Sequence, residues 1–137
     1  MSLYDKYRIL KAEISVKLFG MSVMVDLTNA CSFKCPSCPV GHEVARQSGK
    51  MSTEKFTNVL DRIQSQTKVR NLLFYIFSEP LLAKNLSECI GIAHDRGIYT
   101  MVSTNLSHPE NLGKIMGAGL DELRISFSGF ENGEYFH

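Results

Sequence analysis

Residues 31–38, Cys31-Ser32-Phe33-Lys34-Cys35-Pro36-Ser37-Cys38, are the stretch around which the fold of this chain is organised. Three of the four cysteines lie in it, at spacing C-x3-C-x2-C. Thiolates so close together on a short loop can bind one metal centre, and iron–sulfur clusters are held by cysteine thiolates, usually four for a cubane. Three local thiolates would bind three irons and leave the fourth iron open. An open coordination position is typical of catalytic metal sites, whereas structural sites are closed.

Other interpretations of these cysteines compete with a cluster. A disulfide is not expected, because no secretory leader precedes the loop and three clustered thiols cannot all pair. Zinc is the stronger rival, since Cys31, Cys35, Cys38 and His42 supply four ligands of suitable type. Zinc sites usually contain two separated ligand pairs, and the sequence has no second pair. The fourth cysteine, Cys89, fits a buried thiol in a helix.

Length and composition describe an ordinary globular domain. The chain has 137 residues, of which 44% are hydrophobic and 21% charged, and a net charge of +1. We expect no nucleic-acid partner, because no basic stripe stands out. We expect no membrane partner either, because no apolar run reaches about 18 residues. Free clustered thiols without a leader favour a reducing, cytoplasmic location.

The first 20 residues are predicted to be a separate N-terminal extension. Leu3, Tyr7, Leu10 and Ile14 form a helical apolar stripe that would pack on the rest of the molecule, and Gly20 ends it. Residues 21–137 form the main unit.

The main unit alternates between strand and helix patterns. Strands are predicted at 22–28, 72–77, 98–102 and 123–128, and the run 72–77 is apolar enough to be buried on both faces. The helix at 52–63 has Phe56, Val59, Leu60 and Ile63 on its apolar face, and the helix at 85–96 opens with a capping box of Asn85 and Glu88. The third helix follows a Ser107 cap and turns Leu112, Ile115 and Met116 inward. The sequence therefore predicts an α/β fold with a parallel (β/α)n partial TIM-type barrel, about four strands and three crossover helices plus an N-terminal helix.

Every predicted strand ends in polar residues. These are the cysteine loop, Ser78 with Glu79, Ser103 to Asn105, and Ser126 with Ser128. The carboxyl ends of parallel strands meet at one rim of a sheet, where α/β proteins bind their ligands. The sequence thus predicts a single site at this rim.

The cysteine spacing and its place after the first strand resemble the radical S-adenosylmethionine (SAM) enzymes. Their core is a parallel (β/α)6 partial barrel, and SAM chelates the open iron of the cluster. Phe77-Ser78-Glu79-Pro80 is similar to the Gly-Gly-Glu-Pro-like motif of that family's second strand, with both glycines replaced. The resemblance implies that Glu79 binds the SAM amino group, because a carboxylate pairs strongly with a partly desolvated ammonium.

Further cofactor contacts follow from the same resemblance. Ser103, Asn105, Ser126 and Ser128 resemble polar positions of the family's SAM cleft. Ser78, which replaces a glycine of the second-strand motif, is a further expected cofactor contact. Ser37 stands where the family often has an aromatic residue, so its contact with adenine would use the backbone.

The resemblance implies a [4Fe–4S] cluster on Cys31, Cys35 and Cys38, with SAM as the second cofactor. An external electron donor would reduce the cluster, and SAM would be cleaved to methionine and a 5′-deoxyadenosyl radical that acts on an unknown substrate. The resemblance ends after the fourth strand, so residues 21–137 would be a truncated core. We expect the free edge of that strand to self-associate or to bind a partner. A non-catalytic iron–sulfur or SAM-binding fragment and a zinc-binding structural module remain the alternatives.

Overall fold

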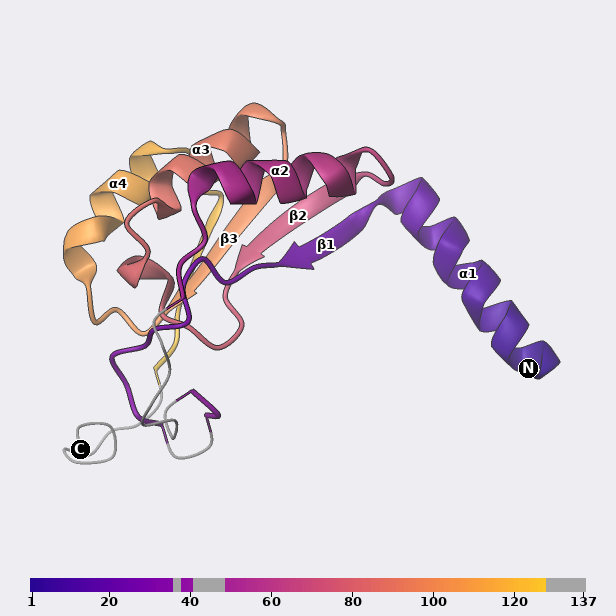
Figure 1. Cartoon of the computed structure of the whole chain (residues 1–137), viewed down its shortest axis with the longest axis horizontal. Coiled ribbons are helices and arrows are strands. Elements are labelled where there is room, and N and C mark those ends of the chain that lie inside the picture. The colour runs from indigo at the N-terminus through magenta and orange to yellow at the C-terminus, as the bar shows by residue number, and fades with distance from the viewer. Residues whose placement is uncertain (36–37, 41–48, 128–137) are drawn as a thin grey trace.

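The computed structural model describes residues 1–35, 38–40 and 49–127, and it contains one parallel sheet (Figure 1). The strands are β1 (Met21–Met24), β2 (Val69–Phe74), β3 (Tyr99–Thr104) and β4 (Glu122–Ile125). They lie in the order β1-β2-β3-β4, and every neighbouring pair is parallel. The helices are α1 (Leu3–Phe19), α2 (Thr53–Gln64), α3 (Leu86–Asp95) and α4 (Leu112–Gly117), with short 3-10 turns at Pro80–Leu82 and Pro109–Asn111. This confirms the predicted α/β fold.

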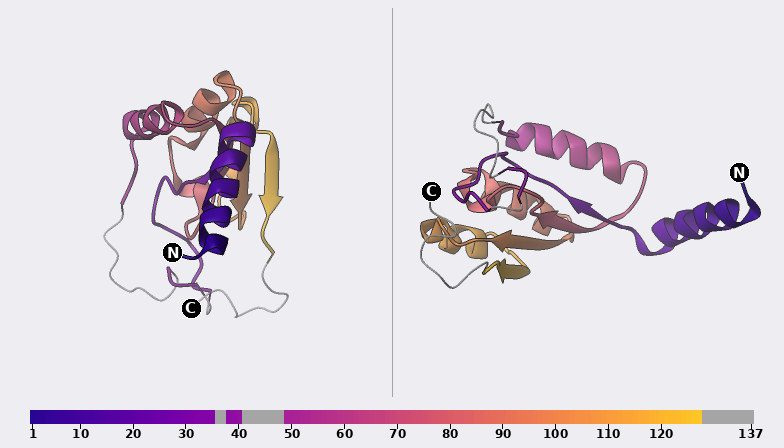
Figure 2. Two further views of the ribbon diagram at one scale, coloured as in Figure 1. Left: turned by 90° about the vertical axis from the view of Figure 1, so that its right-hand side faces the viewer. Right: turned by 90° about the horizontal axis from the view of Figure 1, so that it is seen from below.

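The hydrophobic core lies between the sheet and the helices that follow β1, β2 and β3 (Figures 1 and 2). Leu72, Phe74 and Val102 are almost completely buried, whereas Asn71 and Ser103, on the opposite face, are only partly buried. Strand residues alternate between the two faces of a sheet. The buried face therefore meets the helices through a core that also contains Leu60 of α2, Ile90 of α3 and Ile115 of α4.

The second strand begins and ends earlier than predicted. It covers Val69–Phe74, and Ile76 and Phe77 are exposed instead of buried on both faces. The carboxylate of Asp26 accepts hydrogen bonds from the backbone N–H groups of Ile76 and Phe77, at 3.0 and 3.1 Å. These bonds replace ladder bonds and turn the chain out of the sheet. A single acidic residue after β1 thus sets the end of β2.

The first strand is also shorter than predicted. After Met24 the chain leaves the β1–β2 ladder, although Leu27 and Thr28 remain buried. Thr28 forms an antiparallel bridge with Lys50, and the N–H of Met51 donates to the carbonyl of Leu27 at 2.8 Å. The segment before α2 therefore pairs with the chain that enters the cysteine loop.

Most helix boundaries agree with those predicted from the sequence. Some of the predicted caps and some of the residues predicted to face the core were wrong. Ser52 caps α2 by accepting the N–H of Lys55, yet Val59 is exposed. Asn85 forms no capping box, because its amide donates to the carbonyl of Met51 and to the hydroxyl of Thr53. These bonds tie the start of α3 to the start of α2.

The last crossover helix also differs from expectation. Ser107 does not cap it; its hydroxyl donates to Ser32 in the cysteine loop. Met116 is exposed, whereas Ile115 is buried and Leu112 packs against the core, as predicted. A 3-10 turn at Pro109–Asn111 precedes α4, so the helix begins later than a cap at Ser107 would place it.

The N-terminal helix points away from the sheet (Figures 1 and 2). Ser2 and Asp5 form a capping box, and Gly20 ends α1 at a φ of +75°. None of its residues is buried, so the expectation that its apolar stripe packs on the main unit was wrong. The division of the chain at residue 20 stays a prediction. None of the described helices is both long enough and apolar enough to cross a membrane.

Candidate functional site

The cysteine loop follows β1 and places its thiols at the carboxyl rim of the sheet. Cys31, Cys35 and Cys38 are partly exposed and free of disulfides. The N–H of Cys38 donates to the carbonyl of Cys35 at 3.0 Å, and this turn keeps the two residues together. Cys31 Sγ accepts hydrogen bonds from the N–H of Phe33 at 3.5 Å and from the amide of Asn105 at 3.6 Å. Cys31 is thus tied to the loop that follows β3.

The three thiols influence one another electrostatically. Burial raises the pKa of Cys31, whereas the hydrogen bond from the N–H of Phe33 lowers it. The negative charges of Glu79, Cys35 and Cys38 raise this pKa further. Burial and the charge of Cys38 raise the pKa of Cys35. Thiolates at this rim would repel each other, and a positive metal centre would relieve that repulsion. The donor set therefore fits a thiolate-bound metal group.

The arrangement of the ligands also bears on the kind of metal group. Among the described residues, no three His, Cys, Asp or Glu side chains are grouped round one ion position. A cubane attaches each thiolate to a different iron, so its cysteines need not converge on one point. The arrangement is compatible with a cluster. Ser37, His42 and Ser128 lie outside the described residues.

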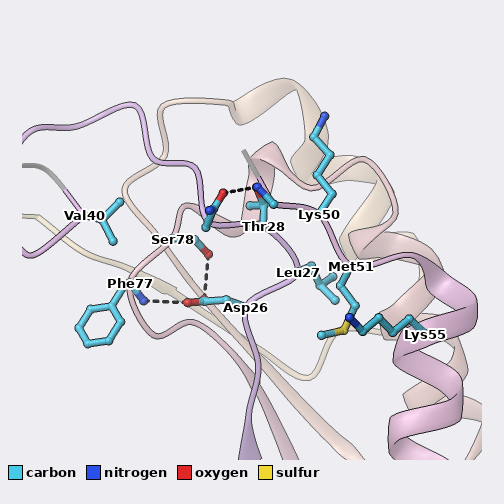
Figure 3. Close-up of a pocket in the computed structure, with 11 residues that line it drawn as sticks. Asp26, Leu27, Thr28, Val40, Lys50, Met51, Lys55, Phe77 and Ser78 are labelled. Atoms are coloured by element: carbon cyan, nitrogen blue, oxygen red, sulfur yellow. Dashed lines mark hydrogen bonds between the residues drawn. The ribbon is translucent and has the colours of Figure 1, made fainter. Parts of the chain in front are cut away.

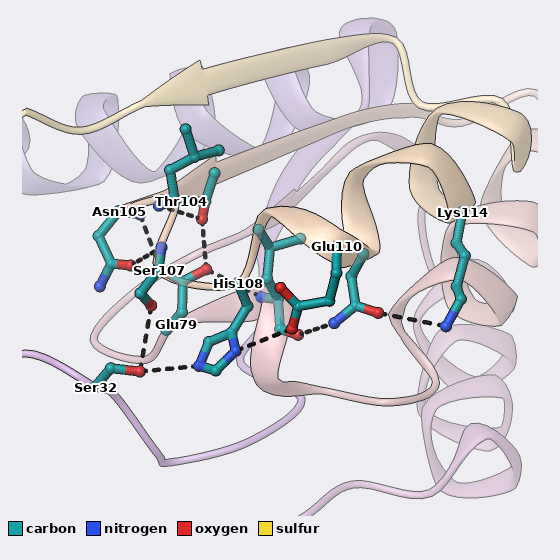
Figure 4. Close-up of polar contacts among 11 residues, drawn as sticks. Ser32, Glu79, Thr104, Asn105, Ser107, His108, Glu110 and Lys114 are labelled. Carbon is teal, nitrogen blue, oxygen red and sulfur yellow. Dashed lines mark hydrogen bonds and ion pairs between the residues drawn. The ribbon is translucent and has the colours of Figure 1, made fainter.

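Glu79 connects three strand ends at the centre of this rim (Figure 4). Its side chain is only 2% exposed. Oε1 accepts hydrogen bonds from the N–H of Leu81 and the hydroxyl of Thr104, and Oε2 accepts the N–H of Asn105 at 2.8 Å. The N–H of Glu79 donates to the carbonyl of Ala30, next to Cys31. A carboxylate offers about four acceptor positions, so one on Oε2 remains for a ligand.

Ser78 belongs to a second cluster of polar contacts at the end of β1 (Figure 3). Its hydroxyl donates to Asp26 at 2.8 Å, so Asp26 accepts three hydrogen bonds in all. Both residues line a cavity of about 270 Å³, together with Lys50, Lys55 and Phe77. The sequence analysis missed Asp26, although an acidic residue within an apolar strand pattern was a usable signal.

The other predicted cofactor contacts lie at different depths in the site. Asn105 is central: its amide contacts Cys31, and its Oδ1 accepts the N–H of Ser107 at 2.9 Å. Ser103 lies within β3, opposite Arg124, and Thr104 takes the position next to Glu79. Ser126 is exposed, and its N–H donates to the carbonyl of Thr104. The structure thus brings Cys31, Glu79 and Asn105 together, with Ser78, Ser103 and Ser126 at the periphery.

Known proteins resemble this chain in sequence and in fold. The PqqA peptide cyclase of Bradyrhizobium diazoefficiens is 29% identical over 127 residues, which are 90% of this chain and 33% of that protein. The PqqA peptide cyclase of Rhodopseudomonas palustris is 30% identical over 113 residues, 81% of this chain and 29% of that protein. The chain therefore spans about a third of the length of these curated relatives.

Solved structures show the same fold. BtrN in complex with AdoMet and 2-DOIA aligns with a TM-score of 0.67 at 19% identity, covering 82% of this chain and 48% of BtrN. BtrN in an open conformation aligns with a TM-score of 0.62 at 18% identity. The four-stranded parallel sheet thus matches part of the BtrN fold.

A model of one protein family covers most of the chain. It is described as the radical SAM superfamily, and it matches residues 25–134, from the end of β1 to beyond β4. The matched region contains the cysteine loop, Glu79 and Asn105, whose contacts build the rim described above. The chain belongs to the radical SAM superfamily of enzymes.

Proposed function

We propose that this chain is the N-terminal part of a radical SAM enzyme core and binds a [4Fe–4S] cluster through Cys31, Cys35 and Cys38. The observation that carries the proposal is the buried Glu79. Its backbone N–H donates to the carbonyl of Ala30, and its carboxylate accepts hydrogen bonds from Thr104 and Asn105 beside Cys31. It fixes the ends of β2 and β3 against the cysteine loop. A cofactor bound by the loop would therefore face groups whose positions are already set.

In this proposal SAM binds along the rim beside the cluster. Glu79 would accept the SAM ammonium at the remaining position of Oε2, and Asn105 would lie near the point where cluster and SAM meet. The other proposed contacts are Ser37, Ser78, Ser103, Ser126 and Ser128. Because the hydroxyl of Ser78 donates to Asp26, its oxygen lone pairs are the part left for a ligand.

The chemistry that a bound cluster supplies is one-electron reduction of the SAM sulfonium, which yields methionine and a 5′-deoxyadenosyl radical. An external one-electron donor is required. The residues of this chain bind the cofactors, orient them and exclude water, which is the usual division of labour between protein and cofactor. Glu79 and Thr104 are buried, and this side of the rim would exclude water from the bound cofactors.

We infer a peptide as the class of substrate. The support is the name of the relatives, which are PqqA peptide cyclases. The sheet face opposite the helices carries Asn71 and Ser103, two partly buried polar side chains that can form hydrogen bonds with a peptide backbone. A cytoplasmic location is part of the same proposal, because free clustered thiols persist in a reducing compartment.

Anaerobic reconstitution with iron and sulfide tests the proposal. We expect a brown protein with about four irons per chain, as a cubane requires. Replacing Cys31, Cys35 or Cys38 by Ala should abolish the cluster, whereas Cys89→Ala should keep it, because Cys89 lies in the core between helices. Stoichiometric zinc that depends on His42 would contradict the proposal and support a zinc module.

Production of 5′-deoxyadenosine under strong reductant separates the enzyme from a fragment that only binds cofactor. We expect this chain to bind the cluster more effectively than it cleaves SAM, because the three cysteine ligands come from one loop, whereas cleavage needs SAM to be held in place by contacts from several strand ends. A cluster-loaded chain that never yields 5′-deoxyadenosine would be the non-catalytic alternative.

A further inference from the structure

A line of hydrogen bonds joins the cysteine loop to the segment that follows β3 (Figure 4). Ser32 Oγ lies 3.1 Å from His108 Nε2 and accepts a hydrogen bond from the hydroxyl of Ser107 at 3.2 Å. On the far side of the ring, His108 Nδ1 lies 3.2 Å from Glu110 Oε1. Four side chains thus connect two segments about 75 residues apart in the sequence.

The protons in this line can be assigned from the chemistry of its ends. A carboxylate can only accept, so His108 Nδ1 carries a hydrogen, and Nε2 of the neutral ring accepts the hydroxyl hydrogen of Ser32. The backbone N–H of Glu110 lowers the pKa of the Glu110 carboxyl, and His108 lowers it to a smaller degree. This carboxyl is therefore ionised at neutral pH. In this assignment each side chain of the line offers its neighbour a donor or an acceptor.

The same segment holds Cys31 from a second side. Asn105 donates to Cys31 Sγ, and Ser32 is the next residue in the loop. Between Asn105 and Ser107, Leu106 adopts a left-handed conformation with a φ of +62°, which is unfavourable for a leucine. This bend lets Asn105 reach Cys31 while Ser107 and His108 reach Ser32. The strained conformation of Leu106 thus allows the contacts of Asn105, Ser107 and His108 with the cysteine loop.

We propose that Ser32, Ser107, His108 and Glu110 form a clamp that fixes the cysteine loop and thereby positions Cys31 for the cluster. The inference rests on the proposed function, because it takes the loop to hold a cluster. The four residues act as positioning residues. Serine, histidine and carboxylate in this order also occur in nucleophilic catalysis, but Ser32 Oγ accepts the hydrogen of Ser107, which makes it a poorer nucleophile.

The test compares cluster retention in the reconstituted chain. We expect Ser32→Ala and His108→Ala to lose iron to EDTA roughly three to ten times faster than wild type, the effect of one or two hydrogen bonds. Ser32→Thr keeps the hydroxyl and should restore slow loss. The double variant should lose iron no faster than the worse single variant, because the two residues act through one contact. Ser65→Ala is the matched control, since the exposed Ser65 lies at the end of α2 and its hydroxyl donates to the carbonyl of Arg62, away from the clamp.

Two further measurements exclude a general loss of structure. The EPR spectrum of the reduced cluster should change in Ser32→Ala and return in Ser32→Thr. In the cluster-free protein, alkylation of Cys31 followed by mass spectrometry should be several-fold faster in Ser32→Ala, at an unchanged urea midpoint. If wild type assembles a cluster and both alanine variants match it in iron loss and in Cys31 alkylation, the clamp is wrong. If wild type itself assembles no cluster, the proposed function has failed instead.

Discussion

At the scale of single residues, Glu79 combines a buried charge with three donors that point at it. Replacing it by Gln turns one acceptor into an NH2 group that faces an N–H or a hydroxyl. A buried donor left without a partner costs about 1–3 kcal/mol. We therefore expect Glu79→Gln to lower the free energy of unfolding by about that amount even without cofactors, as measured by urea denaturation.

Glu88→Gln is the matched control for that substitution. Glu88 is exposed and accepts one hydroxyl, from Thr53, so its loss should cost no more than about 0.5 kcal/mol. Equal stability of the Glu79 variant and wild type would mean that the carboxylate does not hold the rim together. SAM binding by the Glu79 variant is to be measured well below its melting temperature, where a weaker affinity reports on the ligand contact.

Cys89 makes the stability depend on alkaline pH. Burial raises the pKa of its thiol to about 12, with a further contribution from the charge of Glu88. An exposed thiol in the unfolded chain titrates near about 8.5. Between these values the unfolded chain loses its proton while the folded chain keeps it, so stability falls as pH rises. We expect the free energy of unfolding to decrease between pH 8 and 10.5, and less steeply in Cys89→Ala.

The two curves are compared by their slopes, since Cys89→Ala also lowers stability at every pH by leaving a cavity. Parallel curves for the variant and wild type would show that Cys89 contributes nothing to the alkaline loss. The remaining slope in the variant would come from Cys31, Cys35 and Tyr99, whose pKa values are also raised.

At the scale of elements, two glycines should respond to alanine in opposite directions. Gly20 ends α1 at a φ of +75°, and a Cβ there would lie 2.8 Å from the carbonyl oxygen of Lys68. Gly91 lies in α3 with no heavy atom within 4 Å of such a Cβ. We expect Gly20→Ala to destabilise by roughly 1–2 kcal/mol and Gly91→Ala to stabilise by about 0.5–1 kcal/mol, measured by thermal and urea unfolding. A neutral Gly20→Ala would mean that the passage from α1 to β1 can shift without cost.

At the scale of the whole molecule, β4 forms the edge of the described sheet. Ile125 is exposed, and Phe127 is 81% exposed. Unpaired edge strands with apolar side chains promote association. We expect the chain to self-associate through this edge in sedimentation experiments, and Ile125→Lys with Phe127→Lys to shift it towards the monomer. A wild-type chain that sediments as a monomer at high concentration would contradict this expectation.

Much of the fold was determined by local pattern. The cysteine spacing, the helix start at Ser52 and the helix end at Gly20 each depend on residues close together in the chain, so they can be read directly from the sequence. Parallel strands place their carboxyl ends on one rim for geometric reasons. The meeting of the cysteine loop with Glu79 and Asn105 was therefore predictable without knowing any contact.

Only the tertiary structure decided which partner each polar side chain takes. Asp26 ends β2 by binding N–H groups 50 and 51 residues away. His108 reaches Ser32 across 76 residues, and Thr104, not Ser103, faces Glu79. Such contacts depend on strand register and on the face to which each residue turns, and a shift of one residue exchanges the faces. The sequence by itself determined at which rim of the sheet these residues meet, and the packing of the strands determined how they are connected.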